Sequence, residues 1–165
     1  MTTVLNRDSI KVKRDLQKRV ENWVAEYCDA LEENFKQYSI RSYKTNINNP
    51  SEVSKGYTSY YEEQLQKIED GTANLYKFDY KVGKKFIKVF NLQYSEACDY
   101  YNRPAGYRAG SVTAFIDKNT GEVYKPASWK APAKHVRFDL RIIAERNYLL
   151  NPENCDWAGG HLYMR

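Results

Sequence analysis

Five side chains could act as nucleophiles, acid–base groups or zinc ligands: Cys28, Cys98, Cys155, His135 and His161. Zinc sites usually take paired ligands at short spacing. No two of these five residues lie within five positions of each other. The sequence therefore predicts no metal site and no cofactor. A Cys–His nucleophile pair could arise only through the fold, so the sequence leaves that arrangement open.

Motifs for phosphate loops and hydrolase nucleophiles are also missing from the sequence. The glycines do not have Gly-x-Gly-x-x-Gly or Walker spacing, and no Gly-x-Ser-x-Gly elbow occurs. Adjacent acids such as Glu62 and Glu63 would point in different directions on a helix and would not form an acid–base pair. We therefore expect a protein that is not an enzyme.

Basic residues interleaved with aromatic residues are the recurring chemical pattern. The chain carries a net charge of +5 and contains 15 tyrosines. Aromatic platforms flanked by cations are how sheets bind single-stranded nucleic acid. The candidate residues for binding nucleic acid or another partner are Lys84, Lys85, Lys88, Arg103, Tyr107, Arg108, Trp129, Lys130, Lys134 and Arg137.

The same pattern is also compatible with a protein that does not bind nucleic acid. One sheet face could pack its aromatic residues on a helix while the other face carries solvated lysines. Tyrosine-rich surfaces also suit protein interfaces. The first alternative function is binding a host protein or a signalling nucleotide to inhibit host machinery or defence, and the second is a minor structural role in a virion.

The N-terminal part is expected to be helical. Apolar residues recur every three or four positions over residues 7–35, which predicts one long amphipathic helix. Residues 38–50 are interpreted as a connector that ends in turn chemistry. A second helix is predicted over residues 52–69, with Ser51 or Ser54 as N-cap and Gly71 as the C-terminal stop.

The C-terminal part is expected to be a mainly antiparallel sheet. Strict alternation predicts strands over residues 75–82 and 84–92, joined by a hairpin around Gly83. Residues 94–109 are interpreted as a long loop. Strands over 111–116 and 122–125 flank a turn at 117–121, whose Asp, Asn and Gly favour that geometry. The two prolines of residues 126–134 indicate an ordered loop or a short helix.

Two C-terminal segments are less determined by their patterns. Residues 134–146 fit either a strand or a helix. The tail over residues 156–165 is expected to contain a turn, with a short last strand as one option.

Together these elements predict an α+β fold, with the N-terminal helix or helices packed on a four- to six-stranded mainly antiparallel sheet. Residues 1–72 form the helical part and residues 73–165 the β-rich part, expected to make one compact domain. No apolar run approaches the roughly 20 residues that span a bilayer, so no membrane partner is expected. The odd number of widely spaced cysteines and the lack of a secretory signal favour the cytoplasm.

Two stretches of this chain resemble a family of small proteins of tailed bacteriophages. They are DKNTGEVYKPASWKAPAK, within residues 115–134, and DWAGGHLY, residues 156–163. The resemblance covers roughly residues 75–165 and brings no catalytic residues with it. It implies a phage origin and expression in the cytoplasm of an infected bacterium, with the virion as a second location.

Overall fold

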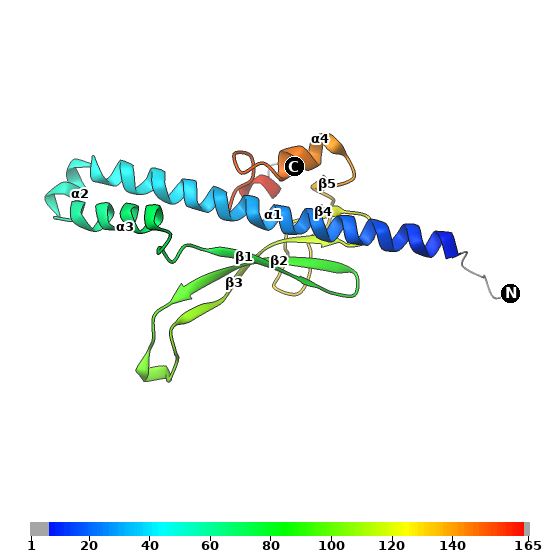
Figure 1. The fold of residues 1–165 in the computed structure, drawn as a ribbon, viewed down its shortest axis with the longest axis horizontal. Helices are drawn as coiled ribbons and strands as arrows, with labels where there is room; N and C mark the ends of the chain where they lie inside the picture. The colour runs from blue at the N-terminus through cyan, green and yellow to red at the C-terminus, as the bar shows by residue number, and fades with distance from the viewer. Residues whose placement is uncertain (1–6, 164–165) are drawn as a thin grey trace.

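A single long helix, α1 (Arg7–Ile47), forms the spine of the molecule, whose computed structural model describes residues 7–163. At 1.5 Å per residue its 41 residues span about 62 Å (Figure 1). The predicted start of this helix at residue 7 is confirmed, and its predicted end at residue 35 is wrong. The three-to-four spacing of half-buried residues continues through the expected connector at Ile40, Tyr43 and Ile47, and α3 packs against this part of α1.

The second predicted helix is two helices, α2 (Pro50–Ser54) and α3 (Thr58–Asp70). Gly56 lies between them with a φ of 78°, a left-handed conformation that ends α2. The N-cap of α2 is Asn49, whose Oδ1 accepts a hydrogen bond from the Ser51 amide at 3.1 Å, so neither predicted serine cap was right. The stop at Gly71 is confirmed, with a φ of 74°.

An antiparallel sheet lies on one side of α1, and its five strands follow chain order. The strands are β1 (Lys77–Val82), β2 (Phe86–Ser95), β3 (Gly106–Asp117), β4 (Glu122–Tyr124) and β5 (Phe138–Asp139). This arrangement confirms the predicted α+β fold with helices packed on an antiparallel sheet. The hairpin between β1 and β2 is also confirmed, and its loop is residues 83–85.

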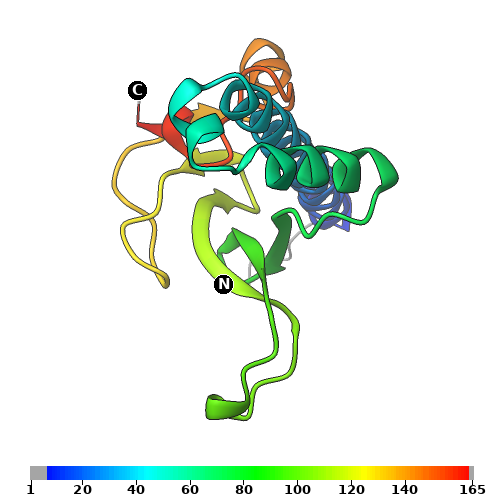
Figure 2. The ribbon, with the colours of Figure 1, turned by 90° about the vertical axis from the view of Figure 1, so that its left-hand side faces the viewer.

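The predicted long loop over residues 94–109 is shorter than expected, because β2 runs to Ser95 and β3 begins at Gly106. β2 and β3 stay paired as far as Ser95 and Gly106, so they form an arm that projects away from the helices (Figures 1 and 2). The 3-10 turn η1 (Asp99–Tyr101) closes the tip of the arm. Two register shifts between β2 and β3 bend the arm, because each bulge adds a residue to one strand and increases its twist.

The turn between β3 and β4 forms as predicted. The Gly121 amide donates to the Asp117 carbonyl at 2.8 Å, and the Asn119 amide donates to the Asp117 side chain at 2.8 Å. Gly121 takes a left-handed φ of 79°. Residues 126–134 form an ordered loop that a Pro126–Pro132 bridge closes.

The segment over residues 134–146 contains a strand and the start of a helix. β5 takes two of its residues, and α4 (Ile143–Leu149) begins soon after. The tail forms the 3-10 turn η2 (Gly160–Leu162), and no strand occurs in its described part, residues 156–163.

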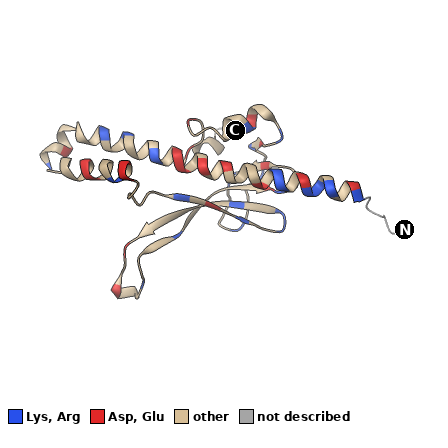
Figure 3. Ribbon diagram, viewed as in Figure 1, with Lys and Arg blue, Asp and Glu red and all other residues tan. Residues whose placement is uncertain are grey.

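Charged residues occur along the whole length of α1 (Figure 3). Within residues 7–163, no helix is both long enough and apolar enough to cross a membrane.

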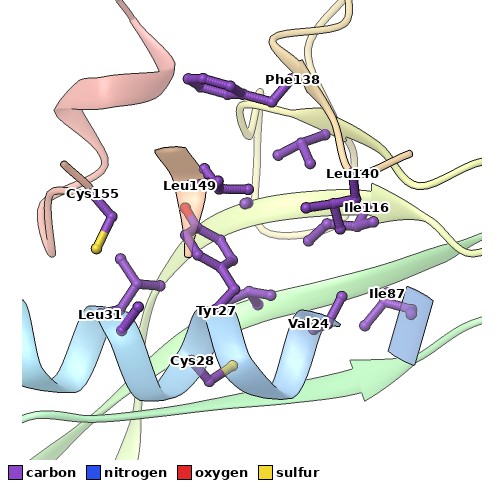
Figure 4. Packing of buried hydrophobic residues seen from close by; sticks show 14 of the residues in the cluster. Val24, Tyr27, Cys28, Leu31, Ile87, Ile116, Phe138, Leu140, Leu149 and Cys155 are labelled. Carbon is purple, nitrogen blue, oxygen red and sulfur yellow. The ribbon is translucent and has the colours of Figure 1, made fainter. Parts of the chain in front are cut away.

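The core lies between α1, one face of the sheet and the C-terminal segment (Figure 4). Its sheet side is mostly aliphatic, from β2, β3 and β4. The helix contributes a stripe spaced by three or four residues, typical of a buried helix face. Fully buried members are Val20, Val24, Tyr27, Leu31, Ile87, Val89, Ile116, Val123, Leu140, Leu149 and Leu162. Aliphatic residues of β2 and β3 occupy this face, and Phe86, Phe90 and Phe115 of the same strands lie on the other face.

Candidate nucleic-acid interface

The hairpin between β1 and β2 presents two exposed lysines at its tip, Lys84 and Lys85. The amide of Gly83 donates to the Phe86 carbonyl at 2.9 Å and closes the turn. A Cβ at Gly83 would lie 2.9 Å from that carbonyl oxygen, so the turn requires glycine. Lys118 fixes the tip to the neighbouring turn, because its Nζ donates to the Gly83 carbonyl at 2.9 Å.

Strand register brings a row of side chains together on the sheet face that points away from α1. Lys81 pairs with Lys88 across β1 and β2, and Lys88 pairs with Phe115 across β2 and β3. Directly opposed residues in a sheet share a face. Ile87 and Val89, the neighbours of Lys88 along β2, point to the other face and belong to the core.

Aromatic rings support these lysines. Phe115 is 3% exposed, yet it is not part of the core cluster around α1. Phe86 packs edge-to-face on Phe115 with ring centroids 6.2 Å apart. Trp129, from the loop over residues 126–134, lies 6.1 Å from Phe90, and the Lys88 ammonium lies 4.7 Å from the Trp129 ring centroid. That distance is within cation–π range.

Lysines and rings together form a hollow of about 310 Å³, with no acidic side chain among the described residues that line it. We call this surface the lysine face; it comprises Lys81, Lys84, Lys85, Lys88, Lys130, Phe86, Phe90, Phe115 and Trp129. Within residues 7–163, none of its five lysines is in an ion pair. Five ammonium groups that make no ion pair within the described residues create a local potential that attracts anions.

The first turns of α1 extend this positive charge. Arg7, Lys11, Lys13, Arg14, Lys18 and Arg19 are all exposed. These turns and the β1–β2 hairpin lie toward the same end of the molecule's long axis (Figure 3). Acidic residues gather in the middle of α1 and on α3, so the two ends of the molecule differ in charge.

Five of the ten predicted site residues come together at the lysine face: Lys84, Lys85, Lys88, Trp129 and Lys130. Lys134 and Arg137 flank the start of β5 and do not line the hollow. Arg137 is half-buried, and its backbone amide donates to the Val123 carbonyl at 2.7 Å.

The remaining three predicted residues lie on the arm. Arg108 donates to the Ser95 hydroxyl at 2.5 Å and to the Pro104 carbonyl at 2.6 Å. Its β2 partner, Gln93, lies five residues from Lys88, or about 17 Å along the strand. The Tyr107 hydroxyl donates to the Leu75 carbonyl at 2.9 Å, and Arg103 bridges to Cys98 at the tip. These residues brace the arm and do not join the lysine face.

The predicted site omitted Lys81, Phe86, Phe90 and Phe115, although all four belong to the lysine face. The sequence of the hairpin does indicate that Lys81 belongs with Lys88. A turn centred between Lys84 and Lys85 opposes Lys81 and Lys88, so both belong on one face. The burial of Phe115 on the outer face had no such signal, because Phe86, which packs edge-to-face on it, comes from another strand.

The cysteines and histidines do not form a nucleophile pair among the described residues. His161 is buried, its Nε2 lies 2.6 Å from the Tyr27 hydroxyl, and its Nδ1 accepts a hydrogen bond from the Asp156 amide at 3.0 Å. Burial raises the pKa of Cys28 and of Cys155 to about 12, so both thiols stay protonated at neutral pH. Residues 7–163 also contain no cluster of three His, Cys, Asp or Glu side chains that could hold a metal ion.

The fold and this face define an α+β protein with a helical spine and a basic, aromatic outer sheet face. The chain belongs to a family described as "Family of unknown function (DUF7717)", whose model matches residues 7–164. The match includes the N-terminal helices as well as the sheet and the C-terminal segment. No curated protein and no solved structure matches the chain significantly.

Proposed function

We propose that the protein binds single-stranded nucleic acid through the lysine face and does not act as an enzyme. The observation that carries this proposal is the hollow in which five lysines surround phenylalanine rings without a lining carboxylate. Proteins that bind single strands combine a positive groove for the backbone with aromatic rings on which bases stack. Both components are present on one sheet face here.

The exposed ring of Trp129 favours a single strand over a duplex. Trp129 is 44% exposed and its ring centroid lies 4.7 Å from the Lys88 ammonium, so an unpaired base could stack on it beside the hollow. Bases of a duplex are already stacked on each other and cannot offer a face to the ring. The basic first turns of α1 would extend the track for the phosphate backbone beyond the hollow.

Fluorescence anisotropy with labelled single-stranded DNA, duplex DNA and RNA of equal length tests the proposal. We expect affinity for single strands to fall as salt rises, because each neutralised phosphate releases counterions. Replacing Lys84, Lys85 and Lys88 with glutamine removes three cations and should reduce the slope of log K against log salt by about 2, at about 0.7 per contact.

The matched control replaces Lys44, Lys55 and Lys67 with glutamine, because this change removes the same charge at the other end of the molecule. Lys55 and Lys67 make surface ion pairs, which contribute little to stability. The control should keep the wild-type slope. Equal losses in both triple variants would show that only net charge matters, and the absence of salt-dependent binding would refute the proposal.

We also propose that the protein acts in the cytoplasm of an infected bacterium, with the virion as the second location. The support is the resemblance of residues 115–134 and 156–163 to tailed-phage proteins. Fractionation of infected cells and mass spectrometry of purified particles distinguish the two locations.

A second candidate function, binding a host protein, is favoured by the tip of the arm. Tyr100 and Tyr101 are 88% and 72% exposed there, and Glu96 and Asp99 give the tip acidic groups that would repel a phosphate backbone. Exposed tyrosines on a projecting hairpin suit a protein contact. Replacing both tyrosines with serine should abolish retention of that protein in pull-downs and leave nucleic-acid binding unchanged; the reverse result would remove this candidate.

A further inference from the structure

Two bulges on β3 gather buried polar side chains at the base of the arm. Between the pairs Val89–Ala114 and Leu92–Ala109, β2 advances by three residues and β3 by five, so β3 has two extra residues. Asn91 and Thr113 lie in this irregular region and are each only 5% exposed. Bulges are over-represented beside binding and active sites because they redirect side chains.

Backbone contacts fix the orientation of two amide side chains there. The Ser111 amide donates to Asn91 Oδ1 at 2.9 Å, and a backbone N–H can only donate, so this atom must be the oxygen. Gln93 Nε2 donates to the same oxygen at 3.1 Å. A Cβ on Gly110 would collide with both amides, so glycine at this position leaves the space that they occupy.

This arrangement leaves three polar groups with hydrogen-bonding capacity to spare. They are the Asn91 Nδ2 donor, the Gln93 Oε1 acceptor and the Thr113 hydroxyl, none of which has a hydrogen bond within residues 7–163. None of these three atoms is fully enclosed by protein, so a ligand or water in the hollow can reach and bond to them. All three side chains line the same hollow.

The hollow has a volume of about 280 Å³, with the rings of Tyr76 and Trp157 as its apolar walls and no charged side chain among its described lining residues. Trp157 is held firmly: its amide donates to Asn34 Oδ1 at 2.9 Å, and its ring packs edge-to-face on Tyr76 at 5.7 Å. Ligand sites are commonly about 300–1,000 Å³, so an occupant of this hollow would be small.

We propose that this hollow, termed the bulge hollow, binds a nucleobase. An amide donor, an amide acceptor and a hydroxyl match the mixed donor–acceptor edge of a base, and the aromatic walls suit its planar ring. The described lining residues include no cation, so the hollow suits an uncharged ligand group better than a phosphate. The site does not depend on the lysine face, because its free groups lie at the β3 bulges and its proposed ligand needs no charge contact.

Nuclear magnetic resonance of the ¹⁵N-labelled protein tests this site, with adenosine, guanosine, cytidine and uridine as probes and ribose as the control. We expect at least one nucleoside to shift the side-chain amide signals of Asn91 and Gln93 in a saturable manner, while ribose shifts neither. A single-stranded oligonucleotide of the preferred base distinguishes a free nucleoside from a base within a strand. If neither the nucleosides nor the oligonucleotide shift these signals, the proposal is overturned.

The Thr113→Val variant sharpens the test. It replaces the hydroxyl with a methyl group of the same shape, and the hydroxyl has no partner to lose, so the fold should be at least as stable as the wild type. Loss of one ligand hydrogen bond should weaken nucleoside binding about three- to tenfold. Thr45→Val, on the exposed side of α1, is the matched control. Unchanged affinity in Thr113→Val would also overturn the proposal.

Discussion

Protonation of His161 should destabilise the protein in mildly acidic solution. The imidazole is 4% exposed and joins the C-terminal segment to α1 through the Tyr27 hydroxyl. Its Nδ1 accepts from the Asp156 amide, so in the neutral ring Nε2 carries the proton and donates it to Tyr27. A second proton on the ring would place a donor against the Asp156 N–H, and the hydrogen bond there would be lost.

The size of this effect follows from the pKa of His161. Desolvation lowers this pKa from 6.5 to about 4, and the nearby carboxylate of Asp156 opposes the shift only in part. Between these values the unfolded chain binds a proton that the native protein does not. Stability is therefore full above pH 6.5 and falls as the pH drops toward 4. At 1.36 kcal/mol per pKa unit, the loss is about 3 kcal/mol.

Urea unfolding of the wild type and of His161→Gln, measured from pH 7 to pH 4, tests this value. Glutamine can accept from the Asp156 amide and donate to Tyr27 but does not titrate, so its stability should change less with pH. His135→Gln, at the exposed histidine, is the matched control for the substitution itself. Hydrogen bonding from Arg141 lowers the pKa of Asp139. The stability that this carboxylate contributes is lost only below the pH range in which His161 titrates, and it is lost in every variant. Identical pH profiles for the wild type and His161→Gln would refute the reasoning.

Further predictions concern the β3–β4 turn and the thiols. Gly121→Ala should lower the free energy of unfolding by about 1–2 kcal/mol, because a φ of 79° strains an L side chain. The new Cβ would also lie 3.3 Å from Leu140 Cβ, whereas a Cβ at Gly71 would have no neighbour within 4 Å. Urea unfolding should therefore show a larger loss of stability for Gly121→Ala than for Gly71→Ala. An equal loss would contradict the packing around Gly121. A thiol reagent at neutral pH should modify half-buried Cys98 first and reach buried Cys28 and Cys155 only through unfolding. Simultaneous reaction of all three would contradict this burial.

Features of the fold encoded by local chemistry could be predicted from the sequence. The turn at Asp117–Gly121 needs only its own side chains and a glycine. The end of α1 and the arm could not be predicted in the same way. The segment after Phe35 stays helical because α3 packs against it, as in the ring contact between Tyr43 and Tyr61. Residues 94–95 and 106–109 stay extended because β2 and β3 pair beyond two bulges.

In the candidate site too, residues close in sequence could be placed from the sequence and residues brought together by the fold could not. Lys84, Lys85 and Lys88 could be placed together because they are close in sequence and share one hairpin. Arg103 and Arg108 were candidates on a predicted loop over residues 94–109, and the structure places them on the arm, away from the lysine face. The contact between Tyr27 and His161 joins residues 134 positions apart, and no local pattern indicates it.

Ultraviolet cross-linking of the protein to single-stranded nucleic acid, followed by mass spectrometry of the linked peptides, tests the central claim most directly. Wild-type protein should cross-link within residues 81–90 and at Trp129, where rings and lysines meet on the outer sheet face. Replacing Lys84, Lys85 and Lys88 with glutamine should reduce these products, while the triple change at Lys44, Lys55 and Lys67 should not. Cross-links confined to the acidic α3 end, or none at all, would contradict binding at the lysine face.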